Sequence, residues 1–332
     1  AVVVDRSSPG HQLPAGQGVG LARKLGADLA LGFKARDLIR AAGFGSTDAD
    51  ASLPADYFDA GEQAVAGAAA GIFPFAHTPS SDPLLDRATC AYELSLRYYV
   101  LGLSHAGSSY AYHSLGSTLY VGFDAYARVR GFPRRQAGED FYLLDKLAKL
   151  GAVQRLTAPL VQIEARLSTR VPFGTGPGVQ RLLDASAGPE ALSLYAPRTF
   201  AVLGEVLASF SEFAQSRDPE RWRRRLNGLP EARTVLGYLD ALDIDAVLRD
   251  ALRQAKSAQH LSRRLRIWFD ALRTLRLIHV LRDHCHPSLP WRRALADAPF
   301  SSLHAQSLDR AVTELRRREL CLASFVGVCG ST

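Results

Sequence analysis

The sequence predicts an α/β protein in its first half and a mostly α-helical region in its second half. Two observations lead to this expectation. Short apolar runs alternate with helix-length amphipathic patterns in the first half, and turn-forming Gly and Pro separate most of them. Beyond Pro177, long amphipathic helical patterns replace this alternation. We therefore expect one domain over residues 1–178 and a helical region over residues 179–332.

The elements of the first half are expected in a regular order. Strands are expected where apolar runs are bounded by turn residues: residues 2–4, 43–47, 68–75, 117–122 and 153–156. Helices are expected where apolar residues recur at helical spacing: residues 18–39, 54–67, 84–103 and 139–150. In the second half, Leu265, Trp268 and Ile278 follow the same spacing with arginines between them.

The composition excludes several classes of protein. With 47% hydrophobic and 22% charged residues in 332, the chain is too apolar for a disordered protein. Its four cysteines match neither a zinc framework nor a disulfide-rich scaffold, so we expect reduced thiols and a cytoplasmic location. Gly, Pro and His interrupt the longest uncharged stretches, so no transmembrane segment is predicted. Because the chain opens on an apolar run without Met, we expect a fragment that lacks its true N-terminus.

The positive charge lies mainly in the second half. Residues 1–180 hold 17 Lys and Arg against 16 Asp and Glu, whereas residues 181–332 hold 23 against 17. The arginine clusters at residues 221–225 and 316–318 could attract nucleic acid, acidic lipid or other phosphates, and a solvated helix face explains the same pattern. We expect no nucleic-acid partner. Peripheral contact of the basic helices with the inner face of a membrane stays open.

Two acidic motifs could carry chemistry. Asp48 and Asp50 follow a predicted strand, and such carboxylates can share Mg²⁺ with substrate phosphates, although a surface turn or N-cap is the simpler explanation. Glu139 and Asp140 begin a predicted helix, whose dipole stabilises acidic residues at that end. The functional alternative is that Asp140 acts as a general base toward an acceptor hydroxyl.

A small polar stretch and a Gly-rich loop accompany these acids. His113, Gly116 and Ser117 lie in a segment leading into a strand, where Gly lets a ligand approach the backbone. A hairpin edge explains the same residues. Arg166 and Arg170 precede several glycines, a combination that suits phosphate binding through guanidinium forks and backbone N–H groups. An interdomain linker is the alternative for this segment.

Taken in order, these pieces resemble inverting glycosyltransferases of family two, which have the GT-A fold. The resemblance covers residues 1–178. Residues 2–5 resemble a strand with an acidic end, residues 18–26 resemble the family's G-x-x-x-A-R-N-x-G helix with Lys24 in place of the usual Asn, and residues 47–50 resemble its D-x-D motif. Gly116-Ser117 with Gly131-Phe132 resembles the acceptor-side segment, and residues 138–140 resemble the E-D motif. The family's first strand and the Q-x-x-R-W motif of its processive synthases are absent from the sequence.

The resemblance implies a metal-dependent enzyme that moves a sugar from a nucleotide-sugar donor to a hydroxyl acceptor. Asp48 and Asp50 would hold Mg²⁺ or Mn²⁺, Asp140 would be the catalytic base, and Glu139 would orient the acceptor or the neighbouring helix. A retaining GT-A transferase and a non-catalytic module that binds phosphate or nucleic acid are the alternatives. The donor and phosphate side would comprise Asp5, Arg23, Lys24 and Arg170, and the acceptor side His113, Gly116 and Ser117.

Overall fold

The computed structural model describes residues 2–14, 16–167, 174–186 and 188–323. It is a mixed α/β structure, which confirms the predicted class, and the strands among these residues form three small sheets. The chain divides into two compact units: unit 1 comprises Ala1–Arg97, Tyr112–Ala191 and Gln306–Thr332, and unit 2 comprises Tyr98–Ala111 and Leu192–Ala305. These limits differ from the expected boundary at residue 178, because the segment up to Ala191 and the last helix group with the N-terminal part.

Unit 1 contains a four-stranded sheet in the order β1-β5-β3-β6. Its strands are β1 (Gly43–Ser46), β3 (Ala70–Ile72), β5 (Leu119–Gly122) and β6 (Val153–Arg155). β1 and β3 each pair antiparallel with β5, and β6 pairs parallel with β3. The carboxyl ends of β1, β3 and β6 therefore lie at one edge of the sheet, together with the amino end of β5.

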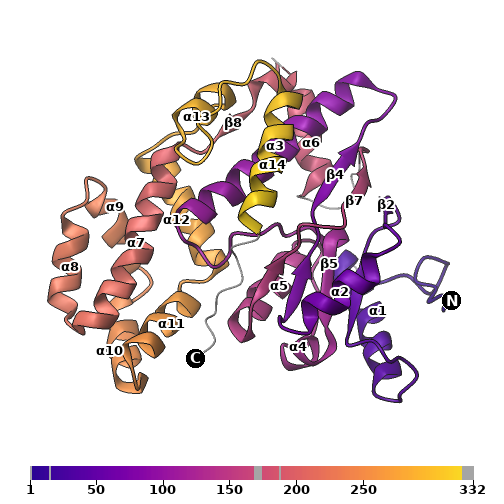
Figure 1. Ribbon diagram of the computed structural model, residues 1–332, viewed down its shortest axis with the longest axis horizontal. Helices are drawn as coiled ribbons and strands as arrows, with labels where there is room; N and C mark the ends of the chain where they lie inside the picture. The colour runs from indigo at the N-terminus through magenta and orange to yellow at the C-terminus, as the bar shows by residue number, and fades with distance from the viewer. Residues whose placement is uncertain (1, 15, 168–173, 187, 324–332) are drawn as a thin grey trace. The chain divides into compact units, whose positions relative to one another are not determined.

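Helices cover both faces of this sheet. They include α1 (Gly18–Lys34), α2 (Tyr57–Val65), α4 (Phe123–Arg128) and α5 (Glu139–Leu150), which contact strands of the sheet and are labelled in Figure 1. Tyr120 of β5 packs directly on Gly61 of α2. Gly45 pairs with Tyr120, so its strand neighbour Phe44 faces the other way, where its ring contacts Phe123 of α4. Thus α2 and α4 lie on opposite faces.

A second sheet of unit 1 has the order β2-β7-β4. Its strands are β2 (Ala51–Ser52), β4 (Phe75–Thr78) and β7 (Val161–Glu164). The chain passes from β3 to β4 through Phe73 and Pro74, so the single strand predicted over residues 68–75 is wrong at its end. Pro74 has no N–H to continue the ladder of β3, which allows the chain to leave one sheet and enter the other.

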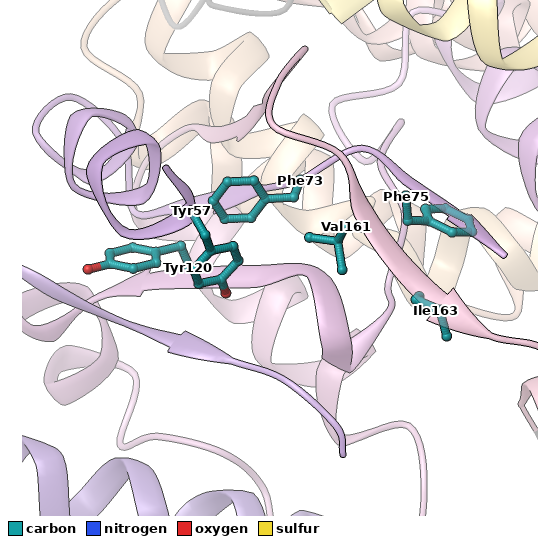
Figure 2. Packing of buried hydrophobic residues seen from close by; sticks show 6 residues of the cluster. All are labelled: Tyr57, Phe73, Phe75, Tyr120, Val161 and Ile163. Atoms are coloured by element: carbon teal, nitrogen blue, oxygen red, sulfur yellow. The ribbon is translucent and has the colours of Figure 1, made fainter. Parts of the chain in front are cut away.

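The hydrophobic core described for unit 1 lies where these two sheets meet. The rings of Tyr57 and Phe73 stack with their centroids 4.3 Å apart, and the Tyr57 hydroxyl donates to the carbonyl of Leu119 at 3.0 Å. The phenol is therefore buried with its polar atom satisfied. Figure 2 shows the six buried side chains in a row: Tyr120, Tyr57, Phe73, Val161, Phe75 and Ile163.

The other elements of unit 1 lie around these sheets and strands. They are η1 (Gly116–Thr118), the first part of α3 (Pro83–His105), α6 (Thr175–Asp184), η2 (Gly188–Ala191) and α14 (Leu308–Ala323). Residues of α3 from Tyr98 onward belong to unit 2. None of the helices in the described ranges combines the length and the apolar character needed to cross a membrane.

The strand predicted over residues 2–4 is wrong. These three valines are exposed and have no strand assignment. Asp5 follows in a turn, where its carboxylate accepts the N–H groups of Ser7 and Ser8, each at 3.0 Å. A short apolar run forms a strand only where another strand pairs with it, and none pairs with residues 2–4 in the part of the chain that the structure describes.

Unit 2 is mostly helical, as predicted. Its strands are β8 (Ser193–Leu194) and β9 (Leu289–Pro290), and its helices after α3 are α7 (Pro197–Ser216), α8 (Pro219–Asn227), α9 (Ala232–Asp240), α10 (Ile244–Gln254), α11 (Ala258–Trp268), α12 (Ala271–His284) and α13 (Trp291–Asp297). The predicted apolar stripe divides between α11 and α12 because Asp270 caps α12, accepting the N–H of Arg273 at 3.1 Å. Leu265 and Ile278 are fully buried, so the stripe packs inside this unit.

Two of the four arginines at residues 221–225, Arg223 and Arg225, form ion pairs within unit 2. Arg223 forms ion pairs with Asp240 and Asp245, each at 2.8 Å. Arg225 pairs with Glu212 at 3.1 Å on a neighbouring helix. Trp222, between these arginines, is buried. The charge pattern left a solvated helix face as the alternative to a phosphate-binding surface, and these ion pairs offset part of the positive charge on that face.

Candidate functional site

The candidate site lies at the edge of the four-stranded sheet where β1, β3 and β6 end. In the antiparallel pairing of β1 with β5, Ser46 stands opposite Leu119. The loop after β1 carries Asp48, and the η1 turn before β5 carries Ser117. The register therefore brings these two segments together, and the Ser117 hydroxyl donates to Oδ2 of Asp48 at 2.7 Å.

The first turns of α1 and α5 reach the same edge. Each helix contacts the strand that follows it, α1 with β1 and α5 with β6. A helix that packs back along its following strand begins near the carboxyl end of that strand. Arg23 lies in the second turn of α1, and Glu139 and Asp140 are the first residues of α5. Gly138, with a φ of 72°, supplies the left-handed conformation from which α5 starts.

The guanidinium of Arg23 connects all of these segments. Its Nε donates to Oε1 of Glu139 at 2.8 Å, and its Nη2 donates to Oδ1 of Asp48 at 2.7 Å. Its Nη1 donates to Oγ of Ser46 at 2.8 Å and to the carbonyl of Gly116 at 3.1 Å. The side chain is only 10% exposed. Four segments that are distant in sequence thus meet on one buried cation, which we call the Arg23 cluster: Arg23, Ser46, Asp48, Gly116, Ser117, Glu139 and Asp140.

Gly116 lies directly against the guanidinium of Arg23. A Cβ atom at this position would lie 2.4 Å from Nη2 of Arg23, which is closer than side-chain atoms approach one another. The missing side chain therefore makes room for the guanidinium. The sequence predicted that Gly116 permits a close approach, and in the structure the approaching group belongs to the protein itself.

Asp140 titrates far from its usual range. Burial and the neighbouring carboxylate of Glu139 raise its pKa to about 7. Hydrogen bonds from the N–H groups of Phe141 and Gly116, and the positive charge of Arg23, act in the opposite direction. The carboxyl group therefore exchanges its proton near neutral pH, which is the range in which a general base is most effective.

Tyr92 of α3 is a neighbour of Asp140 that sequence reasoning missed. Burial raises the pKa of Tyr92, and the charge of Asp140 adds to this effect, whereas a hydrogen bond with Thr175 and the charge of Arg181 lower it. The start of α6 therefore lies near the same carboxyl group. Tyr92 had no signal in the sequence beyond its place in a helical pattern, because its proximity to Asp140 depends on tertiary packing.

Asp50 faces a different arginine from Asp48. Its Oδ2 accepts from Nε of Arg166 at 2.5 Å, and its carbonyl accepts the N–H of Glu164 at 2.9 Å. Asp50 is thus held against the end of β7, whereas Asp48 is held by Arg23. The sequence placed Arg166 in a phosphate-binding segment, but it contained no signal that Arg166 would pair with Asp50.

Two residues expected on the donor side, Lys24 and Asp5, are not part of the Arg23 cluster. The Lys24 ammonium lies 3.0 Å from Asp28 on its own helix and donates to the carbonyl of Arg130 at 3.3 Å. Asp5 lies in the exposed N-terminal turn described above. Arg170 lies outside the described residues. Neighbouring positions on a helix point in different directions, so Lys24 cannot share the surroundings of Arg23.

His113, expected on the acceptor side, is buried elsewhere in unit 1. Its Nε2 lies 2.8 Å from Oε1 of Glu319 on α14, and its ring packs edge-on against Phe75 at 5.0 Å. The side chain is 9% exposed, and its polar partner comes from 206 positions further along the chain, so the sequence could not reveal it. We call this group of charged side chains the Glu93 cluster: His77, Glu93, Arg97, His113, Arg316 and Glu319.

The donor chemistry of Asp48 and Asp50 fits a hard cation that brings further ligands with it. Carboxylate oxygens are the ligands that Mg²⁺ and Mn²⁺ prefer. The side chain of Asp48 is 42% exposed and that of Asp50 is 16% exposed. In the part of the chain that the structure describes, no three His, Cys, Asp or Glu side chains gather to form a closed metal site. Mg²⁺ commonly uses only one or two carboxylates and completes its shell with water and substrate phosphates.

Comparisons of the chain with protein-family models, with curated proteins and with solved structures gave no match. The function is therefore argued from the chemistry of the site. A carboxyl group that titrates near neutral pH lies beside a cation that holds two further carboxylates. This arrangement is suited to removing a proton from a hydroxyl group.

Proposed function

We propose that this chain is a GT-A glycosyltransferase that moves a sugar from a nucleotide-diphosphate donor to an acceptor hydroxyl. The observation that carries the proposal is Asp140, whose pKa of about 7 suits a general base. Arg23, whose charge acts on Asp140, is hydrogen-bonded to Asp48 of the D-x-D motif. The order of these motifs along the chain, which resembles family two, is the second support.

In the proposed reaction Asp140 takes the proton of the acceptor hydroxyl. The hydroxyl oxygen forms a bond to the anomeric carbon of the sugar as the bond between that carbon and the diphosphate oxygen breaks. The electron pair of the broken bond leaves with the nucleoside diphosphate. This single displacement inverts the anomeric configuration. Glu139 is already paired with Arg23, which leaves Asp140 as the carboxylate that can accept the proton.

Asp48 and Asp50 are the residues that would hold Mg²⁺ or Mn²⁺ together with the donor phosphates. When bound, the cation would neutralise charge that develops on the departing diphosphate. The chain's own contribution is orientation: Ser117 and Arg23 each hydrogen-bond one oxygen of Asp48 at 2.7 Å. These two contacts fix the plane of the carboxylate.

The first experiment tests the donor. The chain is incubated with UDP-, GDP- and dTDP-sugars with and without Mn²⁺, and both the melting temperature and the release of nucleoside diphosphate are measured. We expect at least one nucleotide sugar to raise the melting temperature in the presence of Mn²⁺, because a ligand of the native state stabilises it. If the whole panel neither shifts the melting temperature nor is hydrolysed, the proposal is wrong.

The second experiment tests the base with the donor identified in this way. Asp140→Asn should lower turnover by about 10²–10⁴-fold while donor binding is retained, because only the proton acceptor is lost. Asp124→Asn, an exposed carboxylate at the start of α4, is the matched control and should retain full turnover. NMR of the anomeric centre of the product distinguishes inversion from retention. Turnover by Asp140→Asn at the wild-type rate would refute the assignment of the base.

A further inference from the structure

The hydrogen-bonding capacity of Arg23 is almost fully used by the protein. A guanidinium has five N–H donors: one on Nε and two on each Nη. In the structure Nε donates once, Nη1 donates twice and Nη2 donates once. One N–H of Nη2 is therefore the only donor of Arg23 without a described bond. A bidentate phosphate fork needs two parallel donors, so Arg23 is not built to clamp a phosphate.

The partners of Arg23 come from both sides of the proposed reaction. Asp48 belongs to the D-x-D motif on the donor side, and Glu139 is adjacent in sequence to the proposed base Asp140. Both carboxylates contact the same guanidinium, at 2.7 and 2.8 Å. Burial alone lowers the pKa of Arg23, but the charges of Asp48, Glu139 and Asp140 raise it, so the side chain remains a cation.

We propose that Arg23 is the positioning residue of this site, a buried cation that joins the donor-side carboxylate Asp48 to the acceptor-side pair Glu139 and Asp140. It acts through these carboxylates and does not bind the substrate. This inference rests on the proposed function, because only that function makes Asp48 a donor-side residue and Glu139 and Asp140 acceptor-side residues. The charge coupling itself depends only on the contacts of the folded chain.

The groups around Asp140 determine the direction in which the loss of Arg23 would shift the pKa of Asp140. In the described part of the chain, Glu139 on α5, Arg23 on α1 and Tyr92 on α3 interact electrostatically with Asp140. In the folded chain the positive charge of Arg23 partly offsets the effect of the negative charge of Glu139 on Asp140. Without Arg23, Glu139 would act on Asp140 unopposed, so Asp140 would hold its proton more tightly.

The test is a carbon-detected NMR titration of the chain labelled with ¹³C at the Asp carboxyl groups, with Asp140→Asn used to assign the Asp140 signal. In Arg23→Gln, the titration midpoint of Asp140 should rise by about one pH unit above that of the wild type. Lys34→Gln is the matched control, since it removes a cation from the other end of the same helix, where Lys34 donates to the carbonyl of Arg40. This control should leave the midpoint where it is. An unchanged midpoint in folded Arg23→Gln would overturn the proposal.

A second pair of variants covers the case in which Arg23→Gln does not fold. Glu139→Gln removes the negative neighbour and should lower the Asp140 midpoint. The double variant of Arg23→Gln with Glu139→Gln removes both charges of this ion pair, so neither residue is left as an unpaired charge. Its midpoint should lie above that of Glu139→Gln, because the remaining difference is the charge of Arg23. Equal midpoints in these two variants would overturn the coupling.

The kinetic readout separates this inference from the proposed function. With an identified donor, Arg23→Gln should shift the acid limb of the pH–rate profile upward together with the NMR midpoint, which a merely structural loss would not do. Arg23→Lys keeps the charge but loses the fork, so its acid limb should stay near that of the wild type while the KM for the donor rises. If the NMR midpoint shifts but no nucleotide sugar binds or reacts, the proposed function fails and the charge coupling stands.

Discussion

The carboxylate of Glu93 on α3 accepts two N–H groups of Arg316 on α14, at 2.6 and 2.9 Å, although 223 positions separate the two residues. Glu93 is 1% exposed and also accepts from Nε of Arg97 at 2.7 Å. Its second oxygen lies 2.8 Å from Nδ1 of His77. This single carboxylate therefore connects three basic side chains and attaches the last described helix to the rest of unit 1.

Glu93→Gln should destabilise the protein by about 3 kcal/mol, because removing one member of a buried ion pair leaves its partners without compensation. Urea unfolding at pH 7 measures the change. Glu190→Gln is the control, since Glu190 pairs at 3.0 Å with Arg87, whose side chain is largely exposed. An exposed pair contributes at most about 1 kcal/mol. Equal losses for the two variants would show that Glu93 has no special structural role.

The Glu93 cluster should make the stability of the protein sensitive to acid. Burial raises the pKa of Glu93, but hydrogen bonds from His77 and Arg316 and the charge of Arg97 hold it well below its usual range. A depressed native pKa gives stability that is present above the unfolded value of about 4.3 and is lost as the pH falls below it. The free energy of unfolding should therefore decrease between pH 5 and pH 3. Glu93→Gln should show a weaker decrease, and an identical pH dependence in both proteins would contradict this assignment.

Asp140 should have the opposite effect on stability. Its native pKa is raised to about 7, whereas an unfolded Asp has a pKa of about 3.9. Its favourable contribution is therefore fully present below pH 4 and is lost as the pH rises through 7. Asp140→Asn should be more stable than the wild type at pH 8, by about 4 kcal/mol, and this advantage should disappear at pH 4. Thermal unfolding at both pH values checks the sign, and an advantage of Asn that is independent of pH would refute it.

Two glycines near Arg23 should respond to Ala in opposite ways. In Gly116→Ala the new Cβ would displace the guanidinium of Arg23, so we expect a loss of about 1–3 kcal/mol together with an increase in the pKa of Asp140. In Gly26→Ala, on the same helix as Arg23, the Cβ meets no atom within 4 Å, and Ala should gain up to about 1 kcal/mol because it favours the helix. Chemical unfolding measures both changes. A harmless Gly116→Ala would mean that Arg23 is free to move.

Much of the local structure could be predicted from the sequence. The expected helix over residues 139–150 coincides with α5, and the expected strands over residues 43–47 and 153–156 lie within one residue of β1 and β6. These segments have strong periodicity and clear turn residues at their ends. The strand expected over residues 2–4 failed because three valines match a strand locally but require a partner strand to form one.

The residues of the site were predictable in type but only partly in arrangement. Arg23, Asp48 and Glu139 could be singled out from their motifs, and the antiparallel register of β1 with β5 explains why two of their segments meet. Nothing in the motifs distinguished Arg23 from Lys24, although the first enters the cluster and the second does not. His113 was assigned to the acceptor side because its partner Glu319 lies on a helix whose position no local pattern records.

The sequence alone therefore determined most of the helices and strands, where local patterns are strong, and which chemical groups the protein has available. Tertiary structure decided which of these groups act on one another. The pKa of Asp140 and the cationic link through Arg23 arise from burial and from charges brought together across more than a hundred residues. Electrostatic interactions depend on distance in space and on access to water, and neither is encoded in the order of residues along the chain.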